Sequence, residues 1–494
     1  MNTKKTKKLL TAGFFFILGI AFAYIVFLVS RQNKKLLPVG NPPITVEFKE
    51  TNLPIVFINT NGKLKSLSQG KSINSQICII NNEDSRNYAD TSHYTGQRVD
   101  FYGNALIHCH GESSMSFDKK SFTIKLVAET PTKKLKKRLL GMNKTDKWFL
   151  IADYRDGTMM RDALTYELAR PYFDFVPQTR YCEVLMDGVY QGIYLLIEPV
   201  TKDQLGLRKS NKNDKELSGG YILEKDREET FKSKYPARDC AGNEIGSERL
   251  GFEVKYPKPE QLTSEQLQHI QTDLDQMEDA ISRGQYTEYS KFIDVQSFVN
   301  YQLVQEFSNN RDAYIYSHKL YKPLGNTEPF KMALWDFDIA YGNSPSRNGW
   351  YTDINRYQAD CEEKRQEPFW WNKLMQDTTY CQIVKSRWQQ FRNEEYSNAN
   401  IEHKIDSLHT LLTQCHAIER NQKAWNITKK AWLTQPITFE ESVRFLKIWI
   451  IARLDYMDAE LLGTSRDEKK CDSVYREIGK MILCNDYAIT PTSD

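Results

Sequence analysis

The nine cysteines of the 494-residue chain form no C-x-x-C pair, so the sequence gives little support for a structural zinc site. Their number is odd and the chain is long, which excludes a disulfide-stapled miniprotein. Lysine and arginine number 67 against 64 aspartates and glutamates, and the formal charge of +3 gives no reason to expect nucleic acid as a partner. The chain also has no repeat of solenoid or propeller length.

Glycine and proline, at 24 and 17 residues, are too few for a collagen-like or low-complexity chain. Hydrophobic residues make up 40% of the chain and charged residues 27%, a balance that excludes a multi-span membrane protein and a wholly disordered one. The length exceeds what one hydrophobic core usually organises. We therefore expect one large body with two lobes, or two domains.

A single long apolar run stands at the N-terminus. A basic tail, residues 1–8, precedes the uncharged run 9–30, which is long enough to span the hydrocarbon as a helix because about 20 residues suffice. The alternative is a signal peptide cut after Ala23, but the run exceeds the usual roughly 7–15 residues and cleavage would expose the apolar Ile25–Val29. We expect a single-pass signal-anchor.

The basic tail favours a cytoplasmic N-terminus, so we expect the membrane-tethered body to lie outside the cytoplasm. Residues 31–44 are predicted to be a polar linker. Residues 45–260 are predicted to be β-rich, with Asp187-Gly188 as a hairpin turn between two apolar segments. Residues 261–463 are predicted to be helical, and residues 464–494 form a polar tail.

Two capping boxes support the helical assignment. Thr263 with Gln266, and Thr438 with Glu441, have the spacing at which each side chain bonds the other residue's backbone N–H. The second box precedes a stripe of apolar residues at helical spacing, which predicts a helix facing the core.

Two aspartates, Asp336 and Asp338, directly follow a short apolar strand-like segment. In an extended chain residues i and i+2 point to the same side, so both carboxylates could face one point. Adjacent carboxylates repel unless a proton or cation lies between them, and Mg²⁺ favours one or two carboxylates with phosphate oxygens. A D-x-D pair alone is a weak signal, because it also occurs in solvated turns.

Asp312 precedes Asp336 by 24 residues and ends a helix-like segment. That gap allows a strand, a turn and a returning strand, which would bring the two aspartates together. Asp312 could then accept a hydroxyl proton while Asp336 holds a metal. The alternative is a helix C-terminal aspartate that makes only local hydrogen bonds.

A loop of small residues from Gly111 leads to Lys119 and Lys120 at the start of a strand-like segment. Backbone N–H groups of such a loop, and a lysine beside it, can contact phosphate. The loop is not a Walker A motif, since G-x-x-x-x-G-K-[ST] is absent. Paired lysines also occur at ordinary solvated strand ends.

Together these segments resemble the spore-coat protein H (CotH) kinase family. The similar segments run in order over roughly residues 45–463. They are HGESSMSFDKKSFTIKL, DKWFLIADYRDGTMMRDALTYELAR, EVLMDGVYQGIYLLIEPV, GGYILEKD, NNRDAYIYSHKLYK, ALWDFDIAYGN, ERNQKAW and VRFLKIWIIARLDYMD.

The resemblance implies an α+β fold of the atypical protein-kinase-like, two-lobed type, with a β-rich N-terminal part and a helical C-terminal part. It implies ATP and Mg²⁺ or Mn²⁺ as cofactors. With the expected membrane anchor, we expect the acceptor to be a Ser/Thr hydroxyl of an envelope or surface protein. Asp312 is then the expected catalytic residue, and Asp336 and Asp338 are the expected metal ligands.

The same resemblance makes Lys120 the expected contact to the nucleotide phosphates, with Arg161 and Glu198 as supporting charged residues of the nucleotide site. Two positions depart from the family pattern. His110 stands where an arginine is frequent, and Ser317 where an asparagine can serve as a metal ligand. These departures keep open a membrane-tethered binding module without catalysis. A metal-dependent phosphohydrolase, which would use the same carboxylates to activate water, also stays open.

Overall fold

The computed structural model describes residues 39–90, 94–209, 214, 219–226, 228–238, 244–310, 312–325, 328–343, 367–426 and 438–465. The expected membrane segment 9–30 lies outside the described residues, as do nearly all of the expected polar tail and most of the linker. Within the described part of the chain, no helix has the length and apolar character needed to cross a membrane.

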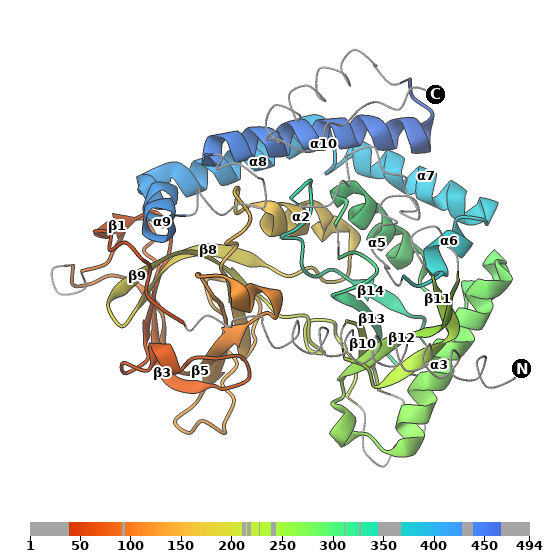
Figure 1. The fold of residues 1–494 in the computed structure, drawn as a ribbon, viewed down its shortest axis with the longest axis horizontal. Helices are drawn as coiled ribbons and strands as arrows, with labels where there is room; N and C mark the ends of the chain where they lie inside the picture. Colours follow the sequence, from red (N-terminus) through yellow and green to blue (C-terminus); the bar gives the residue numbers. More distant parts are fainter. Residues whose placement is uncertain are drawn as a thin grey trace, which may run out of the picture.

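The N-terminal part forms a closed seven-stranded barrel (Figure 1). Adjacent strands of the barrel pair antiparallel, except that β2 pairs parallel with β8 and so closes the barrel. In order around the barrel, the strands are β2 (Ile55–Asn59), β3 (Ile73–Ile80), β5 (Val99–His110), β6 (Ser121–Val127), β7 (Lys147–Ile151), β9 (Val189–Ile197) and β8 (Thr179–Met186).

The hairpin predicted at Asp187-Gly188 joins β8 to β9, with Met186 paired to Val189. Both turn residues have positive φ, 47° and 80°, as a type I′ turn requires. Alternate strand residues such as Ile124 and Trp148 fill the barrel interior, while their sequence neighbours lie on its outer face. This alternation decides which side chains can meet the rest of the protein.

A second, five-stranded sheet combines strands from both halves of the sequence. Its order is β11 (Phe231–Arg238), β12 (Glu244–Tyr256), β10 (Tyr221–Lys225), β13 (His318–Lys322) and β14 (Lys331–Ala333). The pairing of β10 with β13 joins the expected β-rich part to the expected helical part. A separate short pair consists of β1 (Glu50–Thr51) and β4 (Asn87–Tyr88).

The other regular elements of the described residues are helices, and the mixed α+β class with a helical C-terminal part is confirmed. Both predicted capping boxes are present, at the starts of α3 and α10. The α-helices are α2 (Arg161–Ala169), α3 (Ser264–Arg283), α4 (Tyr286–Tyr289), α5 (Val295–Ser308), α6 (Trp370–Leu374), α7 (Thr378–Asn393), α8 (Asn398–Thr413), α9 (Ala417–Trp425) and α10 (Phe439–Leu462). Short 3-10 helices are η1 (Leu64–Ser66), η2 (Ser113–Ser116), η3 (Arg170–Tyr172), η4 (Pro259–Gln261) and η5 (Gln414–His416).

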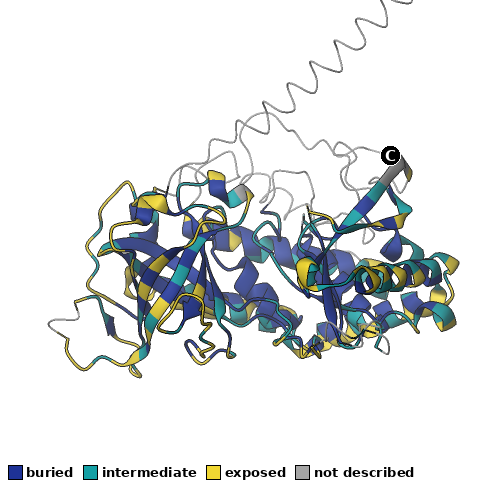
Figure 2. Cartoon of the chain, turned by 90° about the horizontal axis from the view of Figure 1, so that it is seen from below, coloured by how far each residue is buried: buried dark blue, intermediate teal, exposed yellow. Residues whose placement is uncertain are grey.

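Buried residues fill both the barrel and the helical part (Figure 2). The two parts are joined where α9 packs on β9. There the buried Lys119 ammonium donates to the Ala152 carbonyl at 3.1 Å and to Asn421 Oδ1 of α9 at 3.0 Å. Asn421 Oδ1 also accepts from the Ile193 N–H at 3.1 Å. The barrel is therefore held against the helices by a buried polar contact as well as by apolar packing.

Candidate active site

A cavity of about 1430 Å³ lies between the outer face of the barrel, the second sheet and the segments that follow α5 and β14. Both polar and apolar side chains line it. They include His110, Lys125, Lys147 and Phe149 from the barrel, Glu224, Lys255 and Lys319 from the sheet, and Asp312, Trp335 and Asp336 from the two segments.

Asp312 lies just beyond α5, which ends at Ser308 and is followed by Asn309 in the left-handed conformation. Its backbone N–H donates to Asn310 Oδ1 at 3.2 Å, and its carbonyl accepts from the N–H groups of Ile315 and Tyr316. This local turn places the half-buried Asp312 at the cavity wall.

Asp336 lies at the same wall in a strained backbone conformation, with φ of 69°. Its N–H donates to the Tyr166 hydroxyl at 3.1 Å, and its carbonyl accepts from Asn310 Nδ2 at 2.8 Å. Ser317 Oγ donates to its carboxylate at 3.1 Å. Non-glycine residues in this region are held by their surroundings and occur often at functional sites. Asn310 and Ser317 thus tie the Asp312 segment to Asp336.

The carboxylates near Asp336 repel one another. Burial, together with repulsion from the nearby Asp162 and Asp312, raises the pKa of Asp336 to about 7. Burial also raises the pKa of Asp338 well above its usual range, with added repulsion from Asp336, Asp162 and Asp312. The structure therefore brings the three predicted acidic residues into one electrostatic cluster, although Asp338 is not among the residues that line the cavity.

This cluster fits a divalent cation that takes only part of its coordination from protein. In the part of the chain that the structure describes, no group of three or more His, Cys, Asp or Glu side chains is arranged to hold a metal ion. Mg²⁺ commonly uses one or two carboxylates and completes its shell with phosphate and water. Asp336 and Asp338 can supply such ligands, and a cation would relieve their repulsion.

Sequence reasoning missed Asp162, the residue after Arg161. It is buried on α2 and accepts from the Phe337 N–H at 2.8 Å, which fixes the backbone between Asp336 and Asp338. Burial raises the pKa of Asp162 to about 6. The sequence contains one signal for Asp162: it lies in DGTMMRDALTYELAR, part of a segment that resembles the CotH kinase family.

The sequence model of the family described as CotH kinase protein matches residues 107–457, well over half of the chain. The chain belongs to the CotH kinase family. This is a family of atypical kinases. The chain is also 26% identical over 214 residues to the Inner spore coat protein H of Bacillus subtilis (strain 168), covering 42% of this chain and 54% of that protein. It therefore spans about half the length of this curated relative.

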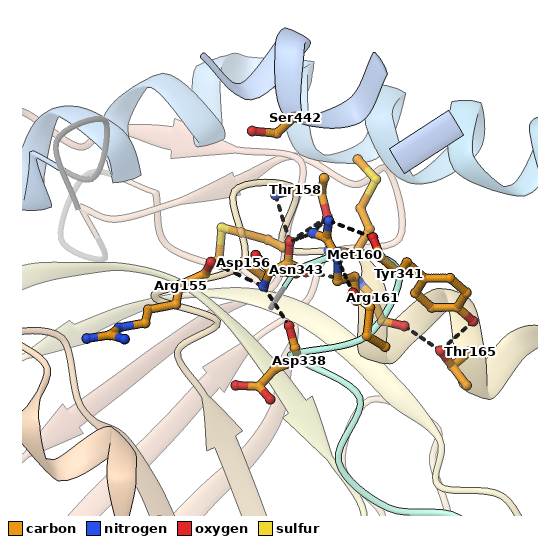
Figure 3. Close-up of polar contacts among 12 residues, drawn as sticks. Arg155, Asp156, Thr158, Met160, Arg161, Thr165, Asp338, Tyr341, Asn343 and Ser442 are labelled. Carbon is orange, nitrogen blue, oxygen red and sulfur yellow. Dashed lines mark hydrogen bonds and ion pairs between the residues drawn. The ribbon is translucent and has the colours of Figure 1, made fainter. Parts of the chain in front are cut away.

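Arg161 of this CotH kinase family member is buried and bonds the segment that follows Asp338 (Figure 3). Its guanidinium forms an ion pair with the buried Asp156, and its Nε donates to the Ala340 carbonyl at 2.8 Å. A second donor reaches the Tyr341 carbonyl at 3.5 Å. Arg161 does not line the cavity and instead fixes the aspartate-bearing segment against α2.

Glu198 and Lys120 also have other partners. Glu198 is buried at the end of β9 and accepts from Asn143 and from the Gln178 N–H at 3.2 Å. The Lys120 ammonium donates to the carbonyls of Met115, at 2.8 Å, and Phe117. Neither residue lines the cavity, so this geometry gives no support to the nucleotide-binding roles expected for Lys120, Arg161 and Glu198.

The two departures from the family pattern both lie at the cavity. His110 packs against Phe149 with ring centroids 4.3 Å apart, and burial lowers its pKa to about 3. It is therefore neutral at physiological pH and cannot replace an arginine as a cation. Ser317 instead keeps a direct contact to Asp336 through its hydroxyl.

Proposed function

We propose that this protein is a kinase that transfers the γ-phosphoryl group of ATP to a Ser or Thr hydroxyl of a protein, with Mg²⁺ or Mn²⁺ as cofactor. One observation carries this proposal. Asp312 and Asp336 come from separate segments, lie at the wall of one large cavity, and are tied together by Asn310 and Ser317.

In this proposal Asp312 orients the acceptor hydroxyl and accepts its proton. It is suited to this role because it is half-buried at the cavity rather than enclosed. Asp336 and Asp338 hold the divalent cation, which when bound neutralises charge on the phosphate oxygens. Asp162, Tyr166 and Arg161 position the backbone that carries both aspartates.

We further propose that residues 9–30 anchor the protein in a membrane with its body outside the cytoplasm, so that the acceptor is an envelope or surface protein. The apolar run and the basic tail before it support this proposal.

The test uses the purified full-length chain, labelled ATP, Mg²⁺ or Mn²⁺, and casein as a generic acceptor beside the chain itself. Asp312→Asn should lower phosphoryl transfer roughly 100-fold or more, because the general base is lost. Asp406→Asn on α8 makes the same change at an exposed ion pair far from the cavity in sequence and should leave transfer unchanged.

Other outcomes point to other functions. Equal transfer by wild type and Asp312→Asn would remove the role assigned to Asp312. Release of labelled phosphate without any acceptor would identify a phosphohydrolase. Absence of nucleotide affinity in a calorimetric titration would identify a binding module without catalysis.

A further inference from the structure

Lysines gather on the barrel side of the cavity because of strand alternation. Ile124 and Trp148 point into the barrel, so Lys125 and Lys147, which follow and precede them, lie on its outer face. These two lysines are direct partners across β6 and β7 and both line the cavity. Like charges in directly opposed positions of an antiparallel pair destabilise a sheet.

The second sheet adds positive charge to the same cavity through Lys255 and Lys319. These two lysines share one buried carboxylate, since both form ion pairs with Glu224. Although burial opposes ionisation, the two ammonium groups lower the pKa of Glu224. Their charge is thus partly compensated inside the protein.

Lys147 differs from them. Among the residues that the structure describes, no carboxylate is paired with it, and its ammonium lies 4.6 Å from the centroid of the Phe149 ring. Burial, together with repulsion from other lysines, beginning with Lys125 and Lys319, lowers the pKa of Lys147 to about 8. A half-buried cation thus lies among like charges, without a paired carboxylate in the described part of the chain.

The lysine cluster adjoins the aspartates through aromatic side chains. The Phe149 ring lies 5.2 Å from the Trp335 ring, and the Lys319 ammonium lies 5.8 Å from the same tryptophan. Trp335 directly precedes Asp336 in the sequence. A chain of phosphates bound at Lys147 would thus extend toward the residues proposed to hold the cation.

We propose that Lys147, with Lys125 and Lys319 beside it, binds the polyphosphate chain of the nucleotide in place of Lys120. This inference rests on the proposed function and assigns its phosphate contacts. Lysine binds phosphate as a point charge and needs a free ammonium group. Lys147 has one at the cavity wall, whereas the ammonium of Lys120 is bonded to two backbone carbonyls.

The test titrates the full-length chain with sodium tripolyphosphate in the presence of EDTA, by isothermal calorimetry. Tripolyphosphate isolates the phosphate chemistry, and parallel titrations with ADP and adenosine separate the contribution of the base. Lys147→Met should weaken tripolyphosphate binding roughly tenfold or more, because a charged hydrogen bond is lost. Lys147→Arg should retain most of the affinity.

Lys144→Met is the matched control, since Lys144 is exposed in the segment before β7 and does not line the cavity. It should bind as the wild type does. A thermal melt without ligand guards against misfolding: Lys147→Met should melt at the same temperature as the wild type or higher, because its repulsion with Lys125 is removed.

The inference is overturned if Lys147→Met binds tripolyphosphate with wild-type affinity, if the wild type does not bind it, or if only Lys120→Met loses binding. These results are separable from the proposed function. Asp312→Asn should still bind tripolyphosphate, so a chain that binds it without phosphoryl transfer keeps the lysine site and loses the kinase proposal. If the wild type transfers phosphate while Lys147→Met binds tripolyphosphate normally, the kinase proposal stands and the lysine site is lost.

Discussion

Replacing Arg161 by methionine should destabilise the protein strongly. The Arg161 side chain is 3% exposed and that of its ion-pair partner Asp156 is 1% exposed. Removing the guanidinium leaves a buried carboxylate without its cation and takes a donor from the Ala340 carbonyl. Removal of one partner of a buried ion pair typically costs about 3–5 kcal/mol, so we expect a loss of that size in the free energy of unfolding.

Urea unfolding followed by circular dichroism measures this loss. Asp156 also accepts from the N–H of Thr158 at 2.8 Å and from its hydroxyl at 2.7 Å, so Asp156→Asn should be destabilising by itself. The double variant, Arg161→Met with Asp156→Asn, should cost less than the sum of the single variants by about 0.5–3 kcal/mol, because it leaves no unpaired charge.

The control is Arg180→Met, at an exposed position on β8, which should change stability by no more than about 0.5 kcal/mol. A loss below about 1 kcal/mol for Arg161→Met, or strict additivity in the double variant, would refute this account of Arg161. Under conditions where the variant stays folded, phosphoryl transfer should fall by up to roughly 100-fold, because a misplacement of about 1 Å in the aspartate segment is sufficient.

Two further predictions concern stability. Burial raises the pKa of Glu278 to about 7 from an ordinary value of 4.5, so the folded protein binds a proton that the unfolded chain has released and becomes less stable as pH rises through this window. The free energy of unfolding of the wild type should therefore fall by on the order of 3 kcal/mol across the window, and Glu278→Gln should remove this fall. Urea midpoints of Glu278→Gln that equal those of the wild type at both pH 5 and pH 8 would contradict this. Gly192 has φ of 98°, and a Cβ there would lie 2.2 Å from Asn421 Oδ1, so Gly192→Ala should lose about 1–3 kcal/mol in the same assay. Gly40→Ala, where an added Cβ meets open space, should not measurably change the free energy of unfolding. Equal losses in both variants would show that the close approach of Gly192 to Asn421 of α9 does not matter for stability.

Features that depend on a few neighbouring residues could be predicted from the sequence. The turn at Asp187-Gly188 forms because these residues tolerate positive φ, and the Thr263 and Thr438 capping boxes form because their partners lie three residues away. The convergence of Asp312 and Asp336 was also predictable, since one strand pair, β13 and β14, lies between them.

Other features of the candidate site depended on partners remote in the sequence. The carbonyl that Arg161 bonds lies 179 residues away, so nothing near Arg161 in the sequence indicated that it would bond the aspartate segment. The sequence placed Lys120 beside a loop of small residues, but only the folded structure has its ammonium donating to two carbonyls of that loop.

By itself, the sequence determined the β-rich and helical parts, the family and the acidic residues, because these follow from local patterns and ordered motifs. Only the tertiary structure decided which cations share the cavity with Asp312 and Asp336. Closure of the barrel puts Lys147 on its outer face, and pairing of β10 with β13 brings Lys319 to Glu224. Burial and the distance between charges control these interactions, and both arise only when segments far apart in the chain pack together.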